Sequence, residues 1–531
     1  MSARRRMGTT ALLLAALLLG GCTTGLREYV HNGFKVGPNY QRPAAPVADE
    51  WIDSESGRLQ IGPVDDKAWW QLFQDPVLDR LVLTAYQQNI TLREAGFRIA
   101  EAQSQRAVTV GNLFPQTQEL FGDYTRTQRS TQTATFPQGA ALPPGLIVTN
   151  FSTYRLGGAL AWELDFWGRY RRAIESADAR LDSEVENYDD VLVLLIAEVA
   201  STYVDIRTLE QRLDYARSNV ALQGESARIA GARLDAAAVD SEVDAPQARS
   251  NLARTQAAIQ LLEVEQRQAQ NRLAVLMGMP PHDLGYLLAG ERGIPQAPQT
   301  VAIDLPASLL RRRPDVRRAE RLVAQQSALI GVAETNLYPA ISINGSLALE
   351  AATFERLFNS DAWSGTVGPA FRWNVLNYGR LVNLVNVEEA RLQQQIAQYQ
   401  QTVLEANEEA ENAIVGFRLY HDQIGYLNES VAQAQEAVRV TQLKYQEGQI
   451  DFNRVFTLEQ LLVTQQDQLA ISAGNSAQSL IQLYRAMGGG WEMRLYPPPP
   501  VALPPVGPAV EPEADPEVDP EVVVPPQPAR P

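Results

Sequence analysis

WELDFWGR (residues 162–169) and WNVLNYGR (residues 373–380) are two versions of one sequence phrase, 211 positions apart. Both run an alternating apolar stretch into Gly-Arg, and both lie in long segments without proline, 145–245 and 370–496. Alternation of apolar and polar residues indicates a β-strand, whereas a proline-free segment rich in Ala, Gln and Glu favours a helix. The sequence therefore predicts, at two places, a strand that passes directly into a very long helix.

The landmarks around these phrases also recur. Residues 76–112 are predicted to form a helix that ends at NLFP, and residues 314–336 form a second helix that ends at NLYP. The order helix, strand, strand, long helix, turn, long helix is therefore predicted twice, which indicates an internal duplication. Four residues mark the predicted junctions between strands and helices: Pro115, Gly168, Pro339 and Gly379.

Each copy contains two segments that alternate between apolar residues and small or polar residues. They are residues 115–126, 154–166, 340–349 and 367–375, and the alternation is weakest in the first. Roughly ten residues with one apolar face suit a strand of a membrane barrel. A strand of a water-soluble sandwich alternates in the same way, so this pattern alone leaves both architectures open.

The long helices favour the membrane interpretation. Residues 168–237 would extend roughly 100 Å as a helix, which no compact globular domain requires. Apolar positions recur there at three- and four-residue spacing, as in coiled coils. A purely fibrous coiled coil would not interrupt itself with paired amphipathic strands. Four strands do not close a membrane barrel, which takes about eight or more, so strands that enter a membrane require self-association.

Charge and composition exclude several classes of function. The chain has 46 Lys and Arg against 62 Asp and Glu, a net charge of −16, which argues against binding of nucleic acid. The one basic cluster, Arg311-Arg312-Arg313, is predicted to be a solvated helix entry before Pro314. One cysteine, three scattered histidines and no nucleophile–base set argue against a disulfide framework, a metal site, a cofactor and catalysis.

The N-terminus resembles a bacterial lipoprotein signal. Three arginines at 4–6 precede an apolar run at 11–20 that is too short to span a bilayer, and Cys22 follows small residues as in a lipobox. The resemblance implies cleavage before Cys22, lipid attachment (palmitate) at this cysteine and, with Thr23 instead of aspartate behind it, sorting to the outer membrane. The alternative is an ordinary secretory signal peptide with a chance cysteine. No later segment has the pattern of a transmembrane helix.

Several further stretches resemble the TolC/OprM family of outer-membrane efflux channels, in its lipoprotein (NodT-like) branch. The resemblance covers roughly residues 36–491 and includes both repeated phrases. The other matching stretches are VGPNYQRP (36–43), WWQLFQDPVLDRLV (69–82), LPASLLRRRPDVRRAE (305–320) and NLYPAISINGS (336–346). The resemblance implies a mainly α fold with a transmembrane β-barrel part. In that family a homotrimer forms a twelve-stranded outer-membrane barrel, four strands per chain, continuous with a long periplasmic α-helical coiled-coil tunnel.

The same resemblance implies that the protein is the exit duct of a tripartite efflux system, as in multidrug efflux. It would conduct small molecules passively from an inner-membrane RND-type pump and a periplasmic adaptor protein to the exterior. It would be lipid-anchored in the outer membrane and extend through the periplasm. The alternative from a different class is a periplasmic structural coiled-coil lipoprotein without channel activity, which would keep the helices but lack barrel strands.

The chain is accordingly divided into six segments. These are a signal peptide 1–21, a lipidated N-terminal extended segment 22–68, a first efflux repeat 69–282, an inter-repeat linker 283–304, a second efflux repeat 305–490 and a disordered tail 491–531. The tail is assigned from its composition, since it combines many prolines and acidic residues without periodicity.

The turns between the long helices, 233–249 and 443–460, resemble the iris-like gate and adaptor contact of the family. The usual glycine is present as Gly448, whereas the first turn has alanine, and the chain has Arg454 where the family often places aspartate. The candidates for gate and adaptor contact are Asp240, Glu242, Asp244, Asp451 and Arg454. We hypothesise that Asp244 and Arg454 pair between neighbouring helices while the other three line an acidic entrance. Solvated turn residues without a gating role are the alternative.

Overall fold

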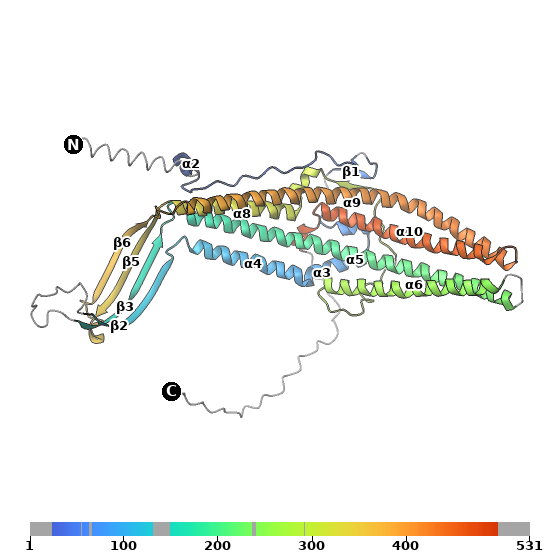
Figure 1. The fold of residues 1–531 in the computed structure, drawn as a ribbon, viewed down its shortest axis with the longest axis horizontal. Helices are drawn as coiled ribbons and strands as arrows, with labels where there is room; N and C mark the ends of the chain where they lie inside the picture. The colour runs from blue at the N-terminus through green and yellow to red at the C-terminus, as the bar shows by residue number, and fades with distance from the viewer. Residues whose placement is uncertain are drawn as a thin grey trace, which may run out of the picture.

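The computed structural model describes residues 24–54, 56–62, 66–130, 149–235, 241–290 and 293–497. The molecule is strongly elongated (Figure 1), with a four-stranded sheet at one end and the ends of two long helical hairpins at the other; α2 lies near the base of the sheet, and β1 and α3 lie near the middle. The α-helices are α2 (Leu26–His31), α3 (Pro76–Gln88), α4 (Ile90–Gly111), α5 (Arg169–Asp235), α6 (Ser241–Leu276), α7 (Leu309–Arg312), α8 (Pro314–Glu334), α9 (Arg380–Gln446) and α10 (Phe452–Ala486). The strands are β1 (Leu59–Ile61), β2 (Thr117–Gln128), β3 (Asn150–Glu163), β4 (Val301–Ile303), β5 (Ala340–Ala351) and β6 (Trp363–Arg372).

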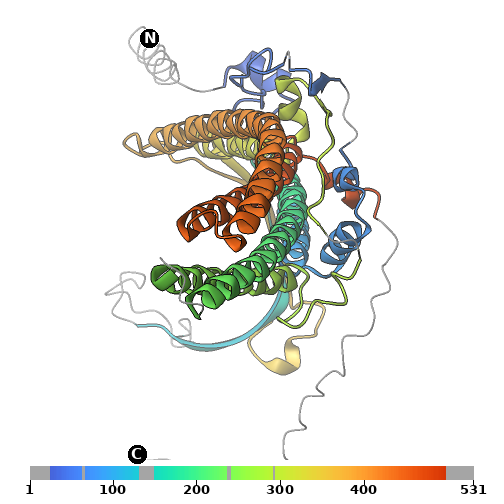
Figure 2. The same cartoon turned by 90° about the vertical axis from the view of Figure 1, so that its right-hand side faces the viewer.

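Two antiparallel hairpins form most of the helical part. α5 and α9 each contain 67 residues, which confirms the long helix predicted behind each repeated phrase. α6 and α10 return along them toward the middle of the molecule (Figure 1). Figure 2 looks at the hairpin end and shows the two hairpins following one arc, with α5 packed against α10. In the described ranges, no helix combines the length and the apolar character needed to cross a membrane.

The strand pairs of the two repeats join into one antiparallel sheet in the order β2-β3-β5-β6. Leu160 on β3 is opposed to Gln118 on β2 and to Gly345 on β5, and Gly345 is opposed to Val367 on β6. Opposed residues of antiparallel strands point to the same side, so the predicted apolar faces of β3, β5 and β6 lie on one face of the sheet. β2 and β6 are its outer strands, and their outer edges have no partner strand in the described part of the chain.

The strands reach further from the helices than their sequence patterns indicated. β2 ends at Gln128, and β6 begins at Trp363 instead of at residue 367. β6 also contains Pro369, which lacks an amide hydrogen. An outer strand tolerates proline because one side of its backbone has no partner to bond.

The single helix predicted over 76–112 is wrong, because the chain breaks at Asn89 between α3 and α4. The Asn89 side chain accepts the amide hydrogen of Leu92 at 2.8 Å and donates to the carbonyl of Leu276, also at 2.8 Å. An asparagine that caps the next helix and binds the end of α6 gives the backbone an alternative to continued helix. The helix predicted over 314–336 is confirmed as α8 with a 3-10 turn behind it.

The main hydrophobic core lies where both repeats, the N-terminal segment and the inter-repeat linker meet. Trp69 stacks on Tyr484 with 5.7 Å between the ring centroids, and both rings are buried. β1 of the N-terminal segment pairs in parallel with β4 of the linker, with Leu59 opposite Val301. Because these large apolar side chains come from all four segments, their burial holds the segments together at this level.

The interpretation of the arginine cluster as a solvated helix entry is wrong for Arg312 and Arg313. Arg312 forms an ion pair with Asp66, 246 residues away. Arg313 is 7% exposed and donates to Glu409 of α9 at 2.9 Å and to the carbonyl of Ala486 at 3.0 Å. These contacts fix the start of α8 against the N-terminal segment and the second hairpin, and a buried arginine is tolerated because its donors are satisfied.

Candidate functional site

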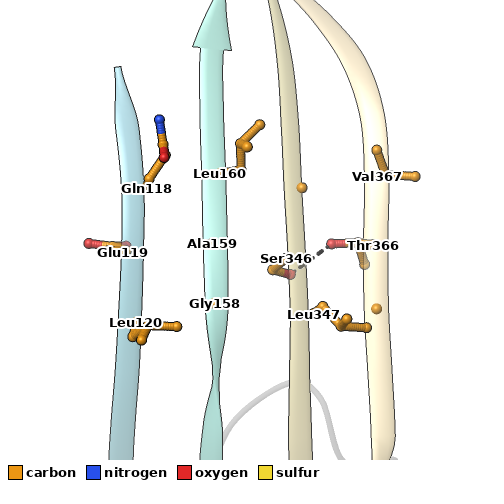
Figure 3. A pocket seen from close by; sticks show the side chains of 12 residues that line it. Gln118, Glu119, Leu120, Gly158, Ala159, Leu160, Ser346, Leu347, Thr366 and Val367 are labelled. Atoms are coloured by element: carbon orange, nitrogen blue, oxygen red, sulfur yellow. Dashed lines mark hydrogen bonds between the residues drawn. The ribbon is translucent and has the colours of Figure 1, made fainter. Parts of the chain in front are cut away.

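The sheet exposes a continuous apolar face. Leu120, Leu347 and Val367 are 92%, 58% and 83% exposed. Between these side chains the face is lined by glycines, and a shallow hollow of about 700 Å³ lies over them (Figure 3). The glycines that line it are Gly158, Gly345 and Gly365. Monomeric soluble proteins rarely expose a large contiguous apolar surface, so this face suits an apolar environment.

The opposite face of the sheet is polar. Arg155 of β3 is opposed to Asp123 on β2 and to Glu350 on β5. The hydroxyls of Ser346 and Thr366 lie 3.0 Å apart across β5 and β6, as the dashed line in Figure 3 marks. Cross-strand pairs of opposite charge and of hydroxyls stabilise a sheet face that contacts water. The two faces of the sheet therefore suit two different media.

Both strand-to-helix phrases make the same tertiary contact. Trp162, the first residue of WELDFWGR, donates its indole N–H to the carbonyl of Leu113 at 3.1 Å. Trp373, the first residue of WNVLNYGR, donates to the carbonyl of Leu337 at 2.9 Å. The two leucines belong to NLFP and NLYP, so the landmarks that recur in the sequence meet in space in both copies.

The predicted junction residues lie where the chain passes between helix and strand. Pro115 and Pro339 precede β2 and β5, and the carbonyl of Pro339 accepts the indole N–H of Trp167 at 2.9 Å. Gly168 and Gly379 precede α5 and α9 with φ angles of 84° and 79°. These are left-handed conformations that glycine adopts without steric cost, so each copy places a glycine where the strand turns into the helix.

The first junction also binds the N-terminal segment, a contact that sequence reasoning missed. Arg171 donates to two backbone carbonyls at 2.7 and 2.8 Å, and Arg172 donates to two more at 2.9 and 2.6 Å, all within residues 33–37. A Cβ on Gly168 would lie 2.8 Å from the Cα of Lys35, so the segment lies directly on the junction. The available signal was the arginine pair behind the first phrase, which has no counterpart behind the second.

The second junction has no such cover in the described part of the chain. Val382 and Asn383 occupy the positions equivalent to the two arginines. Leu376 and Tyr378, just before the helix, are 86% and 100% exposed, and Trp373 is also exposed. Apolar side chains gathered at the base of the sheet indicate a contact surface.

Four of the five gate candidates lie in or beside the hairpin turns of the described chain, and Asp240 lies outside the described residues. Glu242, Asp451 and Arg454 are exposed. Asp451 caps α10, because its side chain accepts the amide hydrogen of Arg454 at 3.2 Å. These three side chains therefore present mixed charge at the surface of the tip.

Asp244 of α6 contacts the second hairpin through Tyr445 of α9 and not through Arg454. It accepts the hydroxyl hydrogen of Tyr445 at 3.0 Å, and Arg233 lies over the tyrosine ring at 4.6 Å. Tyr445 is buried beside Phe452, and this burial, reinforced by the Asp244 carboxylate, raises the pKa of its hydroxyl. The hydroxyl therefore remains a donor. No ion pair joins Asp244 to Arg454 among the described residues, and the helix that Asp244 contacts is α9, through Tyr445.

The start of the described chain is held at the base of the sheet. The amide and the hydroxyl of Thr24 both donate to one carboxylate oxygen of Glu334, at 2.6 and 2.7 Å. Cys22 lies outside the described residues, so lipid attachment there stays a prediction. Among the side chains that the structure describes, no group of three His, Cys, Asp or Glu is placed to hold a metal ion.

Comparison with known proteins gives consistent matches over most of the chain. The family model described as outer membrane efflux protein matches residues 81–279 and 305–489. Nodulation protein T of Rhizobium leguminosarum bv. trifolii is 29% identical over 469 residues, which cover 88% of this chain and 97% of that protein. The pyoverdine export outer membrane protein OpmQ of Pseudomonas putida is 28% identical over 451 residues, with 84% and 93% covered. Among solved structures, the outer-membrane channel OprN is similar with a TM-score of 0.78 at 30% identity, covering 86% of this chain and 99% of that one.

Proposed function

The chain belongs to the outer membrane efflux protein family, and on this premise we propose that it is the exit duct of a tripartite efflux system. The family consists of channels of the outer membrane and not of enzymes, which confirms the expected location and the expected lack of catalysis. In the proposed system, small molecules pass from an inner-membrane RND-type pump through a periplasmic adaptor protein and this duct to the exterior. Passage through the duct is passive, because the pump supplies the energy.

One observation carries the proposal: a sheet with one apolar face, one polar face and two edges that have no partner strand in the described part of the chain stands at the end of long helices. Free edges leave backbone N–H and C=O groups unpaired, which the hydrocarbon of a bilayer does not tolerate. Pairing of β6 with β2 of a neighbouring copy removes these edges. Three copies then supply twelve strands to one closed barrel, with the apolar face toward lipid and the polar face toward a water-filled channel. The hairpins continue this barrel as a coiled-coil tunnel.

The exposed second junction supports self-association. Leu376 and Tyr378 lie at the base of the sheet, where a neighbouring copy joined through β2 would approach them. Burial of two such side chains against a partner contributes about 1.5–3 kcal/mol each at full burial. The first junction needs no such partner, because the N-terminal segment already covers it.

The division of the chain into two efflux repeats, 69–282 and 305–490, is part of this proposal. The two segments that match the family model lie inside these bounds. The N-terminal segment 22–68 and the linker 283–304 brace the repeats through the pairing of β1 with β4. A lipid on Cys22 would add an anchor close to the sheet, because Thr24 is held by Glu334 at the end of α8.

The hairpin turns form the proposed gate and the proposed adaptor contact. The hydrogen bond between Asp244 and Tyr445 connects one hairpin with the other, so an iris-like opening of the tip strains this contact. Glu242, Asp451 and Arg454 are exposed at the turns and available to an adaptor or to a neighbouring protomer. Charged groups of both signs at such a rim favour selective and salt-dependent association.

Planar-bilayer conductance of the purified, lipidated protein tests the proposal, with its mass in detergent measured beside it. A trimer with a small, mostly closed conductance that grows on Asp244→Arg would support both the duct and the gate. Glu225→Arg is the control, because Glu225 is exposed and pairs with its helix neighbour Arg228. A monomer that never conducts would overturn the proposal and favour a periplasmic structural coiled-coil lipoprotein.

A further inference from the structure

One carboxyl group is buried where the two hairpins meet, away from their turns. Glu459 of α10 is 1% exposed and accepts the hydroxyl hydrogen of Ser226 on α5 at 2.6 Å and an amide hydrogen of Asn251 on α6 at 3.0 Å. Gln442 of α9 donates to the Ser226 oxygen at 2.9 Å and lies 3.5 Å from the same carboxyl. Side chains from all four long helices therefore converge on Glu459.

The direct partners of this carboxyl are all neutral, and no ion pair to Glu459 forms in the described part of the chain. Arg254 of α6 is one contact removed, since it donates to the side-chain oxygen of Asn251 at 3.1 Å. On α5, Glu225 and Arg228 beside Ser226 form an ion pair, and on α9 Glu436 pairs with Arg439. Lys444, two residues from Gln442 on α9, is exposed. Burial without a cation raises the pKa of Glu459, although its hydrogen bonds act in the opposite direction.

Glu459 belongs to a polar seam between α5 and α10. Two turns nearer the middle of the molecule, Asn219 donates to Gln466 at 2.7 Å. Between these two contacts, Gln223 is buried and its amide has no hydrogen-bond partner among the described residues. A partly satisfied polar seam joins two helices less firmly than an apolar contact such as the cluster nearer the tip, which includes Ile229 of α5 and Phe452 of α10. The seam is therefore a place where the hairpins can separate.

We propose that Glu459 locks the two hairpins of one protomer together in the closed tip, and that rising pH loosens this lock by removing the proton from its carboxyl. The inference rests on the proposed gating, because the lock opposes separation of the hairpins. The protonated carboxyl donates to Ser226 and still accepts from Asn251, and it buries no charge. The carboxylate keeps hydrogen bonds to the same partners but is a buried charge without a cation, a cost that hydration in an open tip relieves.

The direction of the pH response follows from the two states. The pKa of Glu459 is raised in the closed tip, whereas a hydrated glutamate in an open tip has a pKa of about 4.3. The protonated Glu459 stabilises the closed tip fully below the pKa of the open state. This stabilisation is lost as pH rises through the raised pKa that Glu459 has in the closed tip. Within this window, the ratio of open to closed tips rises by at most about tenfold per pH unit for each carboxyl.

Single-channel recordings of the full-length lipidated protein, from about pH 4 to about pH 8, test the lock. Glu459→Gln is neutral at every pH, and its amide can donate to Ser226 while its carbonyl accepts from Asn251. We expect the wild type to open more often as pH rises, whereas Glu459→Gln keeps the low opening frequency of acid pH throughout. The difference at the alkaline end is at most about tenfold for each pH unit that the window spans. Glu225→Gln removes an exposed carboxyl one residue from Ser226 and should behave as the wild type.

The other outcomes each decide the question. A pH response of the same size in Glu459→Gln and in the wild type would overturn the lock and leave the duct intact. An inserted trimer without opening steps in any variant at any pH would overturn both. If Glu459→Gln fails to assemble, Glu459→Asp decides, because its shorter carboxyl should keep a pH response with a displaced midpoint. An unchanged midpoint would contradict the proposal.

Discussion

Tyr445→Phe should make the hairpin tip open more often. The change removes the hydroxyl that Asp244 accepts from at 3.0 Å, while the ring keeps its place beside Phe452 in the apolar cluster of the tip. A hydrogen bond to a charged group contributes about 1.5–3 kcal/mol. Asp244 is half-buried, so the lower end of that range applies. About 1.5 kcal/mol corresponds to about a tenfold rise in the ratio of open to closed tips for each protomer.

Single-channel conductance in planar bilayers measures this ratio directly, and the detergent mass confirms that the variant assembles. Tyr426→Phe is the matched control, because Tyr426 lies on the same helix, is 77% exposed, and has no hydrogen-bond partner for its hydroxyl among the described residues. Asp244→Asn should have a smaller effect, since an amide oxygen still accepts from Tyr445. If Tyr445→Phe opened no more often than Tyr426→Phe, the contact between the hairpins would have no part in gating.

Three further changes test other parts of the molecule. Gly168→Ala should lower the melting temperature more than Gly379→Ala. Both variants lose about 1 kcal/mol of stability because alanine is strained in the left-handed backbone conformation, but only at Gly168 would the new Cβ also meet the backbone of Lys35, at 2.8 Å. Equal losses would contradict the packing of the first junction. Arg172→Lys should speed proteolytic cleavage within residues 33–37 several-fold, since a lysine does not reproduce the guanidinium geometry that holds two carbonyls and Glu175; the exposed Arg180→Lys should cleave at the wild-type rate. Asp190→Asn should stabilise the protein by about 1–2 kcal/mol near pH 8 and have little effect near pH 4. Burial raises the pKa of Asp190 to about 6, so the stability contributed by its neutral form is lost as pH rises through that value; thermal unfolding at both pH values checks this, and a shift at acid pH alone would refute it.

The parts of the fold that depend on local pattern could be predicted from the sequence. The alternation of apolar and polar residues in β3 and the lack of proline in α5 determine the local backbone conformation. The strand, the helix and the glycine between them therefore follow from the sequence without knowledge of tertiary contacts. The repetition of the phrase then placed the same sequence of elements in the second half. Nothing in this step required knowledge of which segments meet.

The parts that depend on distant partners could not be predicted. Asn89 is a residue type that favours helix caps, but asparagine also occurs inside helices, so the break became certain only through its contact with Leu276, 187 residues away. Asp244 was matched with Arg454 because opposite charges are visible in a sequence, whereas the neutral hydroxyl of Tyr445 gives no comparable signal. The buried carboxyl of Glu459 on α10 likewise has no signal in the sequence, because its burial depends on side chains from four helices at once.

The pairing of β3 with β5 carries information about assembly, because it joins the last strand of one copy to the first strand of the next. β6 is the counterpart of β3 in the second repeat, and β2 is the counterpart of β5 in the first. The outer strands β6 and β2 are therefore equivalent to two strands, β3 and β5, that already pair with each other within the chain. In that joint Leu160 is opposed to Gly345. The equivalent residues at the edges are Phe371 and, by the register of the strand pairs within each repeat, Gly122. In the proposed trimer the barrel thus consists of six strand pairs, two from each chain, and neighbouring pairs are joined in the same way throughout. Three of these strand pairings form within chains and three form between chains. The pairing of β3 with β5 within one chain therefore shows the geometry that the proposed pairing of β6 with β2 between chains would have.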